Sequence, residues 1–435
     1  MTDAMPRFLR QRPPLLPAVL LAGSTLLRAP AGAGDAGERA DIVVDAKGGG
    51  QFRSIQAALD FLAPSTSPVL IYVRNGVYNE KVWIRRDSVA IVGENRDSTR
   101  IVFAELREEW NSAHGGSDWG SGVVNIDTGV TDVTLANLTV YNNYGWKHQV
   151  FNKHQFAIRG AGTRIVLLRC AVVSDGGDAL SLWNRDNGMY YHSDCFFEGW
   201  VDFVCPRGWC YVTHSEFFGH NRPSASIWHD GSGAREQKFV IRSSRFDGIP
   251  GFPLGRNHLD AQVYLLDCSF SKRMADRPFH RPPSSPREWQ WGARHYFHNC
   301  TRDGGNYAWF ADNLDDAEGS PRPDQVTARW TFDGRWDPES SLPAVLPEAF
   351  LPGGQRDRSG VPPEGTTLRW VPGRNAVRHR VHLGTADPPP FVKELADASF
   401  PTGRLKPGTR YYWRVDEVTE QGVIPGGTWR MRTTP

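Results

Sequence analysis

The sequence predicts an all-β protein in which a parallel β-helix, a solenoid of stacked coils, is followed by a small β-sandwich. Glycine (44) and proline (31) are abundant among the 435 residues, which indicates many turns. A short β-forming phrase recurs about every 25 residues between residues 120 and 300, with no amphipathic helix between its copies. Prolines and glycines interrupt this repeat near residue 340, which indicates a second unit after it.

The composition excludes several classes of protein. Apolar residues make up 40% and charged residues 23% of the chain, with 16 Trp and 22 Phe, which is too aromatic for a disordered protein. The formal net charge is +2 and no stripe of Lys and Arg stands out, so nucleic acid is not an expected partner.

The first 33 residues have the composition of an export signal. Arg7, Arg10 and Arg12 precede an apolar run, residues 15–27, and the small residues Ala31-Gly32-Ala33 follow. The run is too short to span a bilayer, which requires ~20 residues. We therefore expect a signal peptide at residues 1–33, no membrane span, and a secreted or periplasmic protein. The alternative is an unstructured N-terminus or a start at Met5.

The recurring phrase consists of two or three β-forming residues, a small or polar residue and another apolar residue. If each copy belongs to one coil, neighbouring strands lie ~4.8 Å apart and the small or polar residues form a column along the solenoid. This column is predicted to contain Asn137, Cys170, Cys195, Ser215, Ser244, Cys268 and Cys300. Its cysteines are then small core residues rather than reactive thiols. A β-sandwich with irregular strands is the alternative.

The ends of the repeat define the expected domains. Apolar residues at positions 52, 55, 58, 59 and 62 have helical spacing and predict a short helix that caps the first coil. We expect the solenoid at residues 41–340, a Pro/Gly-rich linker at 341–351 and the second unit at 352–435. The strands predicted in that unit are Thr367–Trp370, Arg378–Leu383, Tyr411–Glu417 and Thr428–Thr433.

Two further cysteines, Cys205 and Cys210, lie in the phrase CPRGWC. Their spacing matches no zinc pattern and no His pair follows, so neither a metal site nor a cofactor is expected. The pair is interpreted as a disulfide across a turn or as a plain turn.

Two aspartates are the main candidates for chemistry. Asp178, in GGDALSLW, and Asp202, in EGWVDFVCPRG, are 24 residues apart, or one coil. In adjacent coils their carboxyls would share one face and could not comfortably ionise together, so one would be an acid and the other a base or nucleophile. Gln155, one coil earlier, would offer an amide N–H to an oxyanion, and Arg256, two coils later, would keep one carboxylate ionised. Solvated loop charges or a calcium site are the alternatives.

At these residues the sequence resembles the pectin methylesterases, or pectinesterases, whose fold is a right-handed parallel β-helix. The resemblance covers residues 41–335 and rests on five short phrases in the family's order. They are GVYNE at 76–80, Gln155-Phe156-Ala157, GDAL at 177–180, VDF at 201–203 and LGR at 254–256. It implies an esterase that hydrolyses methyl esters of galacturonate in pectin and releases methanol, without a metal.

The resemblance also implies a role for each residue. Asp202 would be the nucleophile, Asp178 the acid and then the base, Arg256 the group that holds Asp202, and Gln155 the donor to the tetrahedral intermediate. This chain departs from the family at three places. Gly177 replaces a second glutamine, which removes an oxyanion donor. Asn257 and His258 replace Pro-Trp, and Val204-Cys205-Pro206 replaces Ile-Phe-Gly.

Aromatic residues near these phrases are candidates for binding sugars, because indole faces stack on them readily. Trp183, Trp200, Trp209 and Trp228 lie in or beside the site segments. We expect Trp183, Trp200, Trp228 and His258 to bind substrate. The alternative is that these rings are wedged between loops and the solenoid.

The C-terminal phrases LKPGTRYYWRVDEV, at 405–418, and GGTWRMRTT resemble a fibronectin type III repeat. The resemblance implies a spacing or attachment role, with sugar binding by Tyr411, Tyr412 and Trp413 as an alternative. The expected protein is a monomer that acts on pectin or a related polygalacturonate. Three alternatives remain: an esterase or thioesterase for another ester, a non-catalytic β-helix that binds acidic polysaccharide, and a calcium-dependent lyase that a chelator would inactivate.

Overall fold

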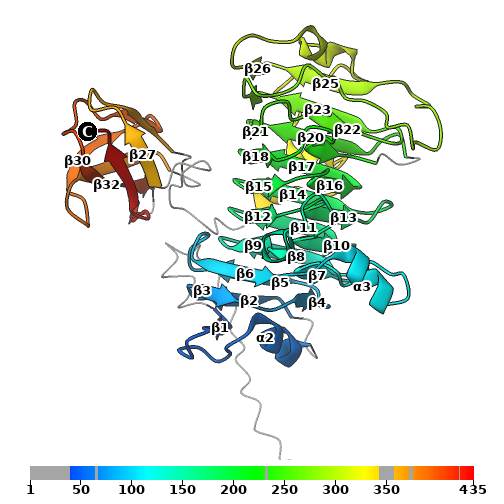
Figure 1. Ribbon diagram of the computed structural model, residues 1–435, viewed down its shortest axis with the longest axis horizontal. Helices are drawn as coiled ribbons and strands as arrows, with labels where there is room; N and C mark the ends of the chain where they lie inside the picture. The colour runs from blue at the N-terminus through cyan, green and yellow to red at the C-terminus, as the bar shows by residue number, and fades with distance from the viewer. Residues whose placement is uncertain are drawn as a thin grey trace, which may run out of the picture.

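The computed structural model describes residues 40–63, 67–230, 234–341, 357–370, 372, 376–420 and 422–435. The predicted signal peptide, and the predicted linker beyond Ser341, lie outside these residues. Residues 42–302 form a parallel β-helix whose coils stack along one axis (Figure 1). Each complete coil contributes one strand to each of three parallel sheets, here called A, B and C. The predicted solenoid is confirmed, and the sandwich alternative for this part of the chain is wrong.

The order of strands in each sheet follows the chain, because every coil stacks on the preceding one. Sheet A contains β1 (Ile42–Val44), β2 (Val69–Val73), β5 (Val89–Gly93), β8 (Thr131–Ala136), β11 (Thr163–Leu168), β14 (Met189–Ser193), β17 (Trp209–Thr213), β20 (Lys238–Arg242), β23 (Gln262–Leu266) and β25 (Arg294–His298). Sheet B contains β3 (Gly76–Tyr78), β6 (Thr99–Phe103), β9 (Thr139–Asn142), β12 (Ala171–Ser174), β15 (Phe196–Gly199), β18 (Glu216–Gly219), β21 (Arg245–Gly248), β24 (Ser269–Phe270) and β26 (Thr301–Arg302). Sheet C contains β4 (Val82–Ile84), β7 (Val124–Ile126), β10 (Ile158–Gly160), β13 (Leu180–Trp183), β16 (Val204–Arg207), β19 (Ile227–Trp228) and β22 (Gly255–Arg256).

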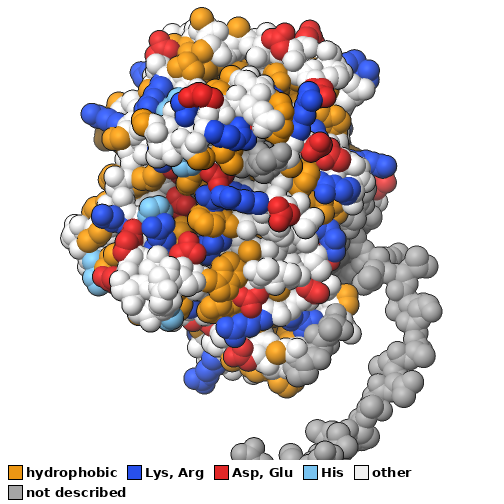
Figure 2. Space-filling view, turned by 90° about the vertical axis from the view of Figure 1, so that its right-hand side faces the viewer, with side chains coloured by type: hydrophobic (Ala, Val, Ile, Leu, Met, Phe, Trp, Pro, Cys, Tyr) orange, Lys and Arg blue, Asp and Glu red, His pale blue; other side chains and the backbone are white. Residues whose placement is uncertain are grey.

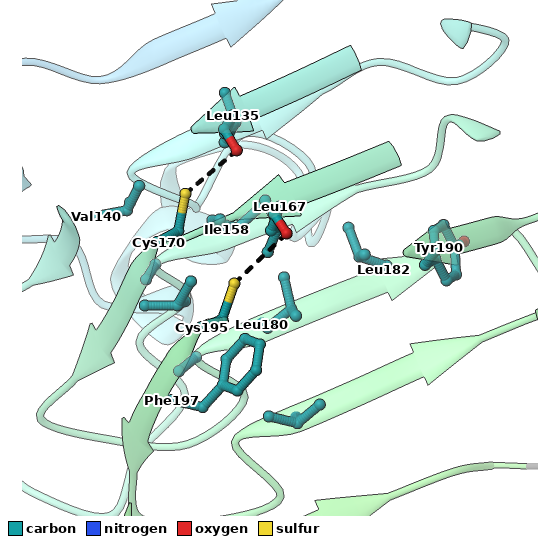
Figure 3. Packing of buried hydrophobic residues seen from close by; sticks show 14 of the residues in the cluster. Leu135, Val140, Ile158, Leu167, Cys170, Leu180, Leu182, Tyr190, Cys195 and Phe197 are labelled. Carbon is teal, nitrogen blue, oxygen red and sulfur yellow. Dashed lines mark hydrogen bonds between the residues drawn. The ribbon is translucent and has the colours of Figure 1, made fainter. Parts of the chain in front are cut away.

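The predicted column of small and polar residues lies at the corner between sheets A and B, where it points into the core. Figure 3 shows Cys170 and Cys195 among the aliphatic side chains, with their thiols donating to the carbonyls of Leu135 and Leu167 at 3.3 and 3.5 Å. The N–H of Cys195 donates to the hydroxyl of Ser215 at 3.0 Å. All six cysteines are buried free thiols, so no bridge joins Cys205 to Cys210.

One member of that column was predicted wrongly. Ala171 pairs with Thr139, which places Leu138, not Asn137, beside Cys170. Asn137 is the preceding turn residue, with a left-handed φ of 54°, and the equivalent Arg169 has a φ of 49°. Asn tolerates a left-handed backbone, and its side-chain amide forms hydrogen bonds with nearby backbone groups. A polar residue in the repeated phrase can therefore occupy either the turn position or the core position that follows it.

Both ends of the solenoid are covered. Helix α2 (Ile55–Leu62), close to the predicted span, begins where the Ser54 side chain accepts the N–H of Ala57, and its apolar face packs under the first coil (Figure 1). At the other end, Phe310 of η1 (Ala308–Phe310) packs against Phe270, with 5.3 Å between the ring centres. The chain then continues through η2 (Leu314–Asp316), α5 (Ala328–Thr331) and α6 (Pro338–Ser341), and α5 packs on β17 and β20 of sheet A.

Residues 357–435 form two sheets with their own core. The larger sheet has the order β27 (Asp357–Val361), β34 (Trp429–Thr433), β32 (Arg410–Thr419), β29 (Arg378–Gly384) and β30 (Phe391–Leu395), with β33 (Gly422–Ile424) paired to β32. The smaller sheet pairs β28 (Thr367–Arg369) with β31 (Ser399–Pro401). Trp370, Val381, Trp413 and Met431 are buried together. All four predicted strands are present within one or two residues. Among the described residues, no helix is long and apolar enough to cross a membrane.

Candidate active site

The candidate residues lie on the outer face of sheet C and at its edge. Along β13, Leu180 and Leu182 point into the core, so Ser181 and Trp183 point outward. The side of the molecule that carries sheet C shows basic, acidic and hydrophobic side chains interspersed (Figure 2). Two loops from sheet B to sheet C contain short helices, α3 (Arg107–Ala113) and α4 (Tyr144–His148), on this side of the solenoid.

Asp178 and Asp202 occupy equivalent positions in neighbouring coils. Leu180 pairs with Val204, so the two aspartates, each two residues earlier, lie in register at the turn into sheet C. Both have left-handed backbone, with φ of 54° and 45°. Their N–H groups bond to the next coil, Asp178 to the Val201 carbonyl at 2.7 Å and Asp202 to the Ala225 carbonyl at 2.8 Å. The repeat therefore fixes the backbone of both residues.

Asp202 is held by an arginine. Nε of Arg256 donates to Oδ1 of Asp202 at 3.0 Å, and Nη2 donates to Oδ2, which makes a bidentate pair. Asp202 is 1% exposed. The pKa of Asp202 is raised to about 7, chiefly by burial and in smaller part by nearby Asp178, although the bonds from Arg256 favour its ionised form.

Asp178 has no such partner. It is 2% exposed, and burial raises the pKa of its carboxyl above the usual range. Among the described residues, Oδ1 accepts no hydrogen bond, and Oδ2 lies 3.7 Å from the thiol of Cys205. The pair is thus asymmetric, because Asp202 is bonded twice by the Arg256 guanidinium, whereas Asp178 lies beside the thiol of Cys205. Such asymmetry divides acid and base roles between two carboxyls.

Gln155 lies one coil before Asp178, but its side chain is already engaged. Oε1 accepts the N–H of Gly145 at 2.9 Å and Nε2 donates to the Val150 carbonyl at 2.7 Å. These bonds hold the loop that contains α4. No described residue accepts the second amide hydrogen, which is the one needed for the oxyanion role that the sequence predicts, and the side chain is fully buried.

Gly177, where the resemblance expects a glutamine, lies in a tight place. A Cβ at this position would stand 3.0 Å from Cβ of Val201 and 3.1 Å from its carbonyl oxygen, which accepts the N–H of Asp178. A side chain at Gly177 therefore requires Val201, whose carbonyl accepts the N–H of Asp178, to move by a few tenths of an ångström.

Two of the predicted binding residues, Trp183 and Trp228, project from sheet C beside the aspartates. Arg207 Cζ lies 3.5 Å from the ring centre of Trp183 and 5.0 Å from that of Trp228. The third predicted residue, His258, packs edge to face against Trp228, with 4.9 Å between the ring centres. Its Nδ1 is hydrogen-bonded to Oδ1 of Asp230 at 3.2 Å. These three residues are brought together on one surface.

The other two tryptophans are not on the strands of sheet C. Trp200 stacks between Phe151 and His220, with distances between ring centres of 5.4 and 5.7 Å, near the turn from sheet B to sheet C. Trp209, expected in or beside the site segments, is on β17 in sheet A, where its indole N–H donates to Asp333 at 2.8 Å. That expectation is wrong, because Gly208 turns the chain from sheet C to sheet A immediately before Trp209.

Sequence reasoning missed Arg207 and Asp230. Arg207 is 3% exposed and donates through Nε to Asp230 at 2.8 Å. Its position was detectable, since Cys205 and Arg207 both alternate outward along β16, three and five residues after Asp202. The pairing of Arg207 with Asp230 was not detectable from the sequence, because it joins two coils whose register depends on the length of the intervening loop.

Comparisons with known proteins show what this chain is similar to. Residues 41–226 match the sequence profile of the family described as Pectinesterase. Pectinesterase QRT1 of Arabidopsis thaliana is 28% identical over 172 residues, 38% of this chain and 43% of that protein. Pectinesterase A of Dickeya chrysanthemi is 31% identical over 97 residues, 22% of this chain and 26% of that protein. The chain thus spans less than half the length of these curated relatives.

Solved structures share the fold. A pectin methylesterase in complex with a hexasaccharide aligns with a TM-score of 0.55 at 20% identity, over 69% of this chain and 98% of that one. Pectin methylesterase from carrot aligns with a TM-score of 0.53 at 19% identity, over 70% of this chain and 96% of that one. The fold is therefore the parallel β-helix of those enzymes, and the segment that carries Asp178 and Asp202 is similar in sequence to pectinesterases.

Proposed function

We propose that this protein is a pectinesterase-type carboxylic ester hydrolase, which removes methyl esters from galacturonate residues of pectin and releases methanol. One observation carries the proposal. Asp202, paired bidentately with Arg256, lies in register with the unpaired and buried Asp178, within the segment that matches pectinesterases. The two carboxyls supply a nucleophile and an acid for ester cleavage.

The reaction is proposed to proceed in two acyl transfers. The ionised Asp202 attacks the ester carbonyl, and the tetrahedral intermediate collapses to an anhydride between Asp202 and the galacturonate. The departing methoxide takes the proton of Asp178 and leaves as methanol. Asp178, now a carboxylate, removes a proton from water, which attacks the anhydride, and both carboxyls return to their starting states.

The electrostatics favour this assignment of roles over its reverse. Arg256 stabilises the ionised form of Asp202 through two hydrogen bonds, so Asp202 loses its proton first. Asp178 is buried with no cation bonded to it among the described residues, and it retains its proton while its neighbour is charged. The mechanism requires a protonated acid and an ionised nucleophile at the same pH. Both requirements are met if Asp202 loses its proton before Asp178 does.

Stabilisation of the oxyanion is proposed to rest on Gln155. Its Nε2 keeps one hydrogen beyond the bond to Val150. Gly177 offers no side chain for this purpose, so the rate is expected to fall below that of an enzyme with two amide donors. Losing one such donor can cost about 3 kcal/mol of transition-state stabilisation.

The test is methanol release from highly methylated pectin by the purified chain, with and without a chelator. Asp202→Asn and Asp178→Asn are each expected to reduce release by at least about a thousandfold, while chelator has no effect. Asp186→Asn, on an exposed turn, is the matched control and should retain full activity. No release by the wild-type protein from pectins of several degrees of methylation would reject the proposal, and inhibition by chelator would favour the lyase alternative.

We also propose the roles of the flanking segments. Residues 1–33 direct export, which places the enzyme outside the cytoplasm with its polysaccharide, and a Pro/Gly-rich linker follows the solenoid. Residues 357–435 form a fibronectin type III-like unit that spaces or attaches the enzyme. Two sheets around Trp370, Val381 and Trp413 support this resemblance.

A further inference from the structure

The larger C-terminal sheet, orange to red in Figure 1, has an outer face that is rich in arginine. Along β32, β34 and β29, alternate side chains are buried in the core between the two C-terminal sheets. The residues between them therefore point away from the core. The arginines on this outer face are Arg378, Arg380, Arg410, Arg414, Arg430 and Arg432.

Three of these arginines are paired with carboxylates. Nε of Arg378 and Nε of Arg380 lie 2.8 and 2.9 Å from the carboxylate oxygens of Glu394, and Nε of Arg414 lies 2.7 Å from Oδ1 of Asp416. The side chains of the other three form no ion pair or hydrogen bond within the described part of the chain. We define the arginine cluster as these three exposed residues and the tyrosine among them: Arg410, Tyr412, Arg430 and Arg432.

Strand pairing forces two of the unpaired arginines together. Arg410 of β32 lies directly opposite Arg432 of β34, and the next outward pair is Tyr412 with Arg430. The Cβ atoms of directly opposite residues are ~5 Å apart, and like charges at this separation destabilise a sheet. The fold therefore gathers positive charges at a cost in stability, and an anion bound between them would offset that cost.

Tyr412 gives the arginine cluster an aromatic ring. The alternative in which Tyr411, Tyr412 and Trp413 bind sugar together is wrong, because Tyr411 and Trp413 are 9% and 3% exposed and belong to the core. Tyr412 alternates with them and is partly exposed on the outer face. Its register partner on β29 is Gly384, which has no side chain to cover the ring. An aromatic ring suits the apolar face of a sugar, and a guanidinium suits a carboxylate.

We propose that the arginine cluster binds an anionic polysaccharide, with de-esterified polygalacturonate as its ligand. Each free galacturonate residue offers a carboxylate to an arginine and a sugar face to Tyr412, whereas a methyl ester removes the charge. The choice of polymer rests on the proposed function, because ester hydrolysis creates this anion from neutral pectin. The product of the reaction then becomes the anchor of the enzyme, which stays on polymer that it has begun to de-esterify.

The first experiment measures binding of the full chain to polygalacturonate. All proteins carry Asp202→Asn, so that methyl esters survive when fully methylated pectin is the comparison ligand. Arg432→Gln should raise the dissociation constant for polygalacturonate about tenfold, as loss of a charge-assisted bond predicts. Arg369→Gln is the matched control, because Arg369 is exposed on β28 of the smaller sheet, and it should change the constant by less than about twofold. Binding should weaken as salt rises.

Polyglutamate and duplex DNA separate a polysaccharide site from a surface that binds any polyanion. Tyr412→Ala should weaken binding of polygalacturonate and leave binding of polyglutamate unchanged, because only the sugar stacks on the ring. Equal affinity of the parent protein for polygalacturonate and either other polyanion would overturn the assignment. Equal affinity for fully methylated pectin, or equal effects of Arg432→Gln and Arg369→Gln, would do so as well.

Two further measurements separate binding from folding and from catalysis. Arg432→Gln relieves the like-charge pair, so its midpoint of denaturant unfolding should not lie below that of the parent protein, and a lower midpoint would contradict the cost assigned to that pair. In the chain with Asp202 intact, Arg432→Gln should leave kcat/KM for a short methylated oligogalacturonate unchanged. Absence of methanol from every substrate, with binding of polygalacturonate retained, would reject the proposed function and leave the arginine cluster as a binding site.

Discussion

At the scale of single residues, environment separates two identical side chains. Asp178 and Asp202 share backbone conformation, register and burial, because the solenoid repeats its geometry from coil to coil. Their partners differ, since Asp202 receives two bonds from Arg256 and Asp178 faces the thiol of Cys205. The chemistry of the candidate site therefore depends on one arginine placed two coils away.

The pH dependence of activity follows from Asp202. Its pKa is raised to about 7, and in the proposed mechanism only its ionised form attacks, so kcat/KM should fall about tenfold per pH unit below that value. Methanol release is measured from pH 5 to 9, with a blank that corrects for alkaline hydrolysis of pectin. If kcat/KM fell only below about pH 4, the ordinary pKa of an aspartate, the raised pKa of Asp202 would be contradicted. The Asp186→Asn control, on an exposed turn, should show the same pH dependence as wild type.

At the scale of elements, the corner between sheets A and B shows how a coil is joined to the next. Cys195, Ser215 and Ser244 lie in one column, and each serine hydroxyl accepts a backbone N–H from the preceding coil. Ser215 also donates to the carbonyl of Thr213, the last residue of β17. A hydroxyl at this corner therefore satisfies a buried donor where the strands of the two sheets diverge.

Replacing Ser215 tests this arrangement. Ser215→Ala leaves the N–H of Cys195 buried without an acceptor, and the free energy of unfolding should fall by about 2 kcal/mol. Ser98→Ala, on an exposed turn, should change it by less than about 0.5 kcal/mol. Denaturant unfolding followed by circular dichroism gives both values. Equal effects of the two substitutions would show that the corner hydrogen bonds contribute little.

At the scale of the whole molecule, the chain contains separate cores. The solenoid interior and the layer between sheet A and α5 belong to residues 42–332, whereas the C-terminal sheets bury Trp370, Val381 and Trp413 among themselves. Glu339, in α6, still bonds to Tyr191 of sheet A. The solenoid unit thus extends at least to α6.

Truncation tests this division. A chain that ends at Ser341 keeps α5 and α6, so we expect it to fold and to release methanol from soluble pectin within about twofold of the full chain, as independent domains do. Ending the chain at Gly305 instead removes Phe310 and the cover of sheet A, and should yield aggregated protein. Loss of folding in the longer truncation would mean that the C-terminal sheets stabilise the solenoid.

The sequence by itself determined the solenoid, its capping helix, the strands of the C-terminal unit and the register of Asp178 with Asp202, since local patterns repeat at the coil period. It misplaced Asn137 by one position and Trp209 by one sheet, because a single turn residue decides which face or sheet follows. Only the tertiary structure decided that Arg207 joins Asp230, that Gln155 holds a loop, and that arginines and tryptophans alternate along sheet C. Those contacts join coils separated by loops of unequal length, and side-chain packing across such loops is absent from any local pattern.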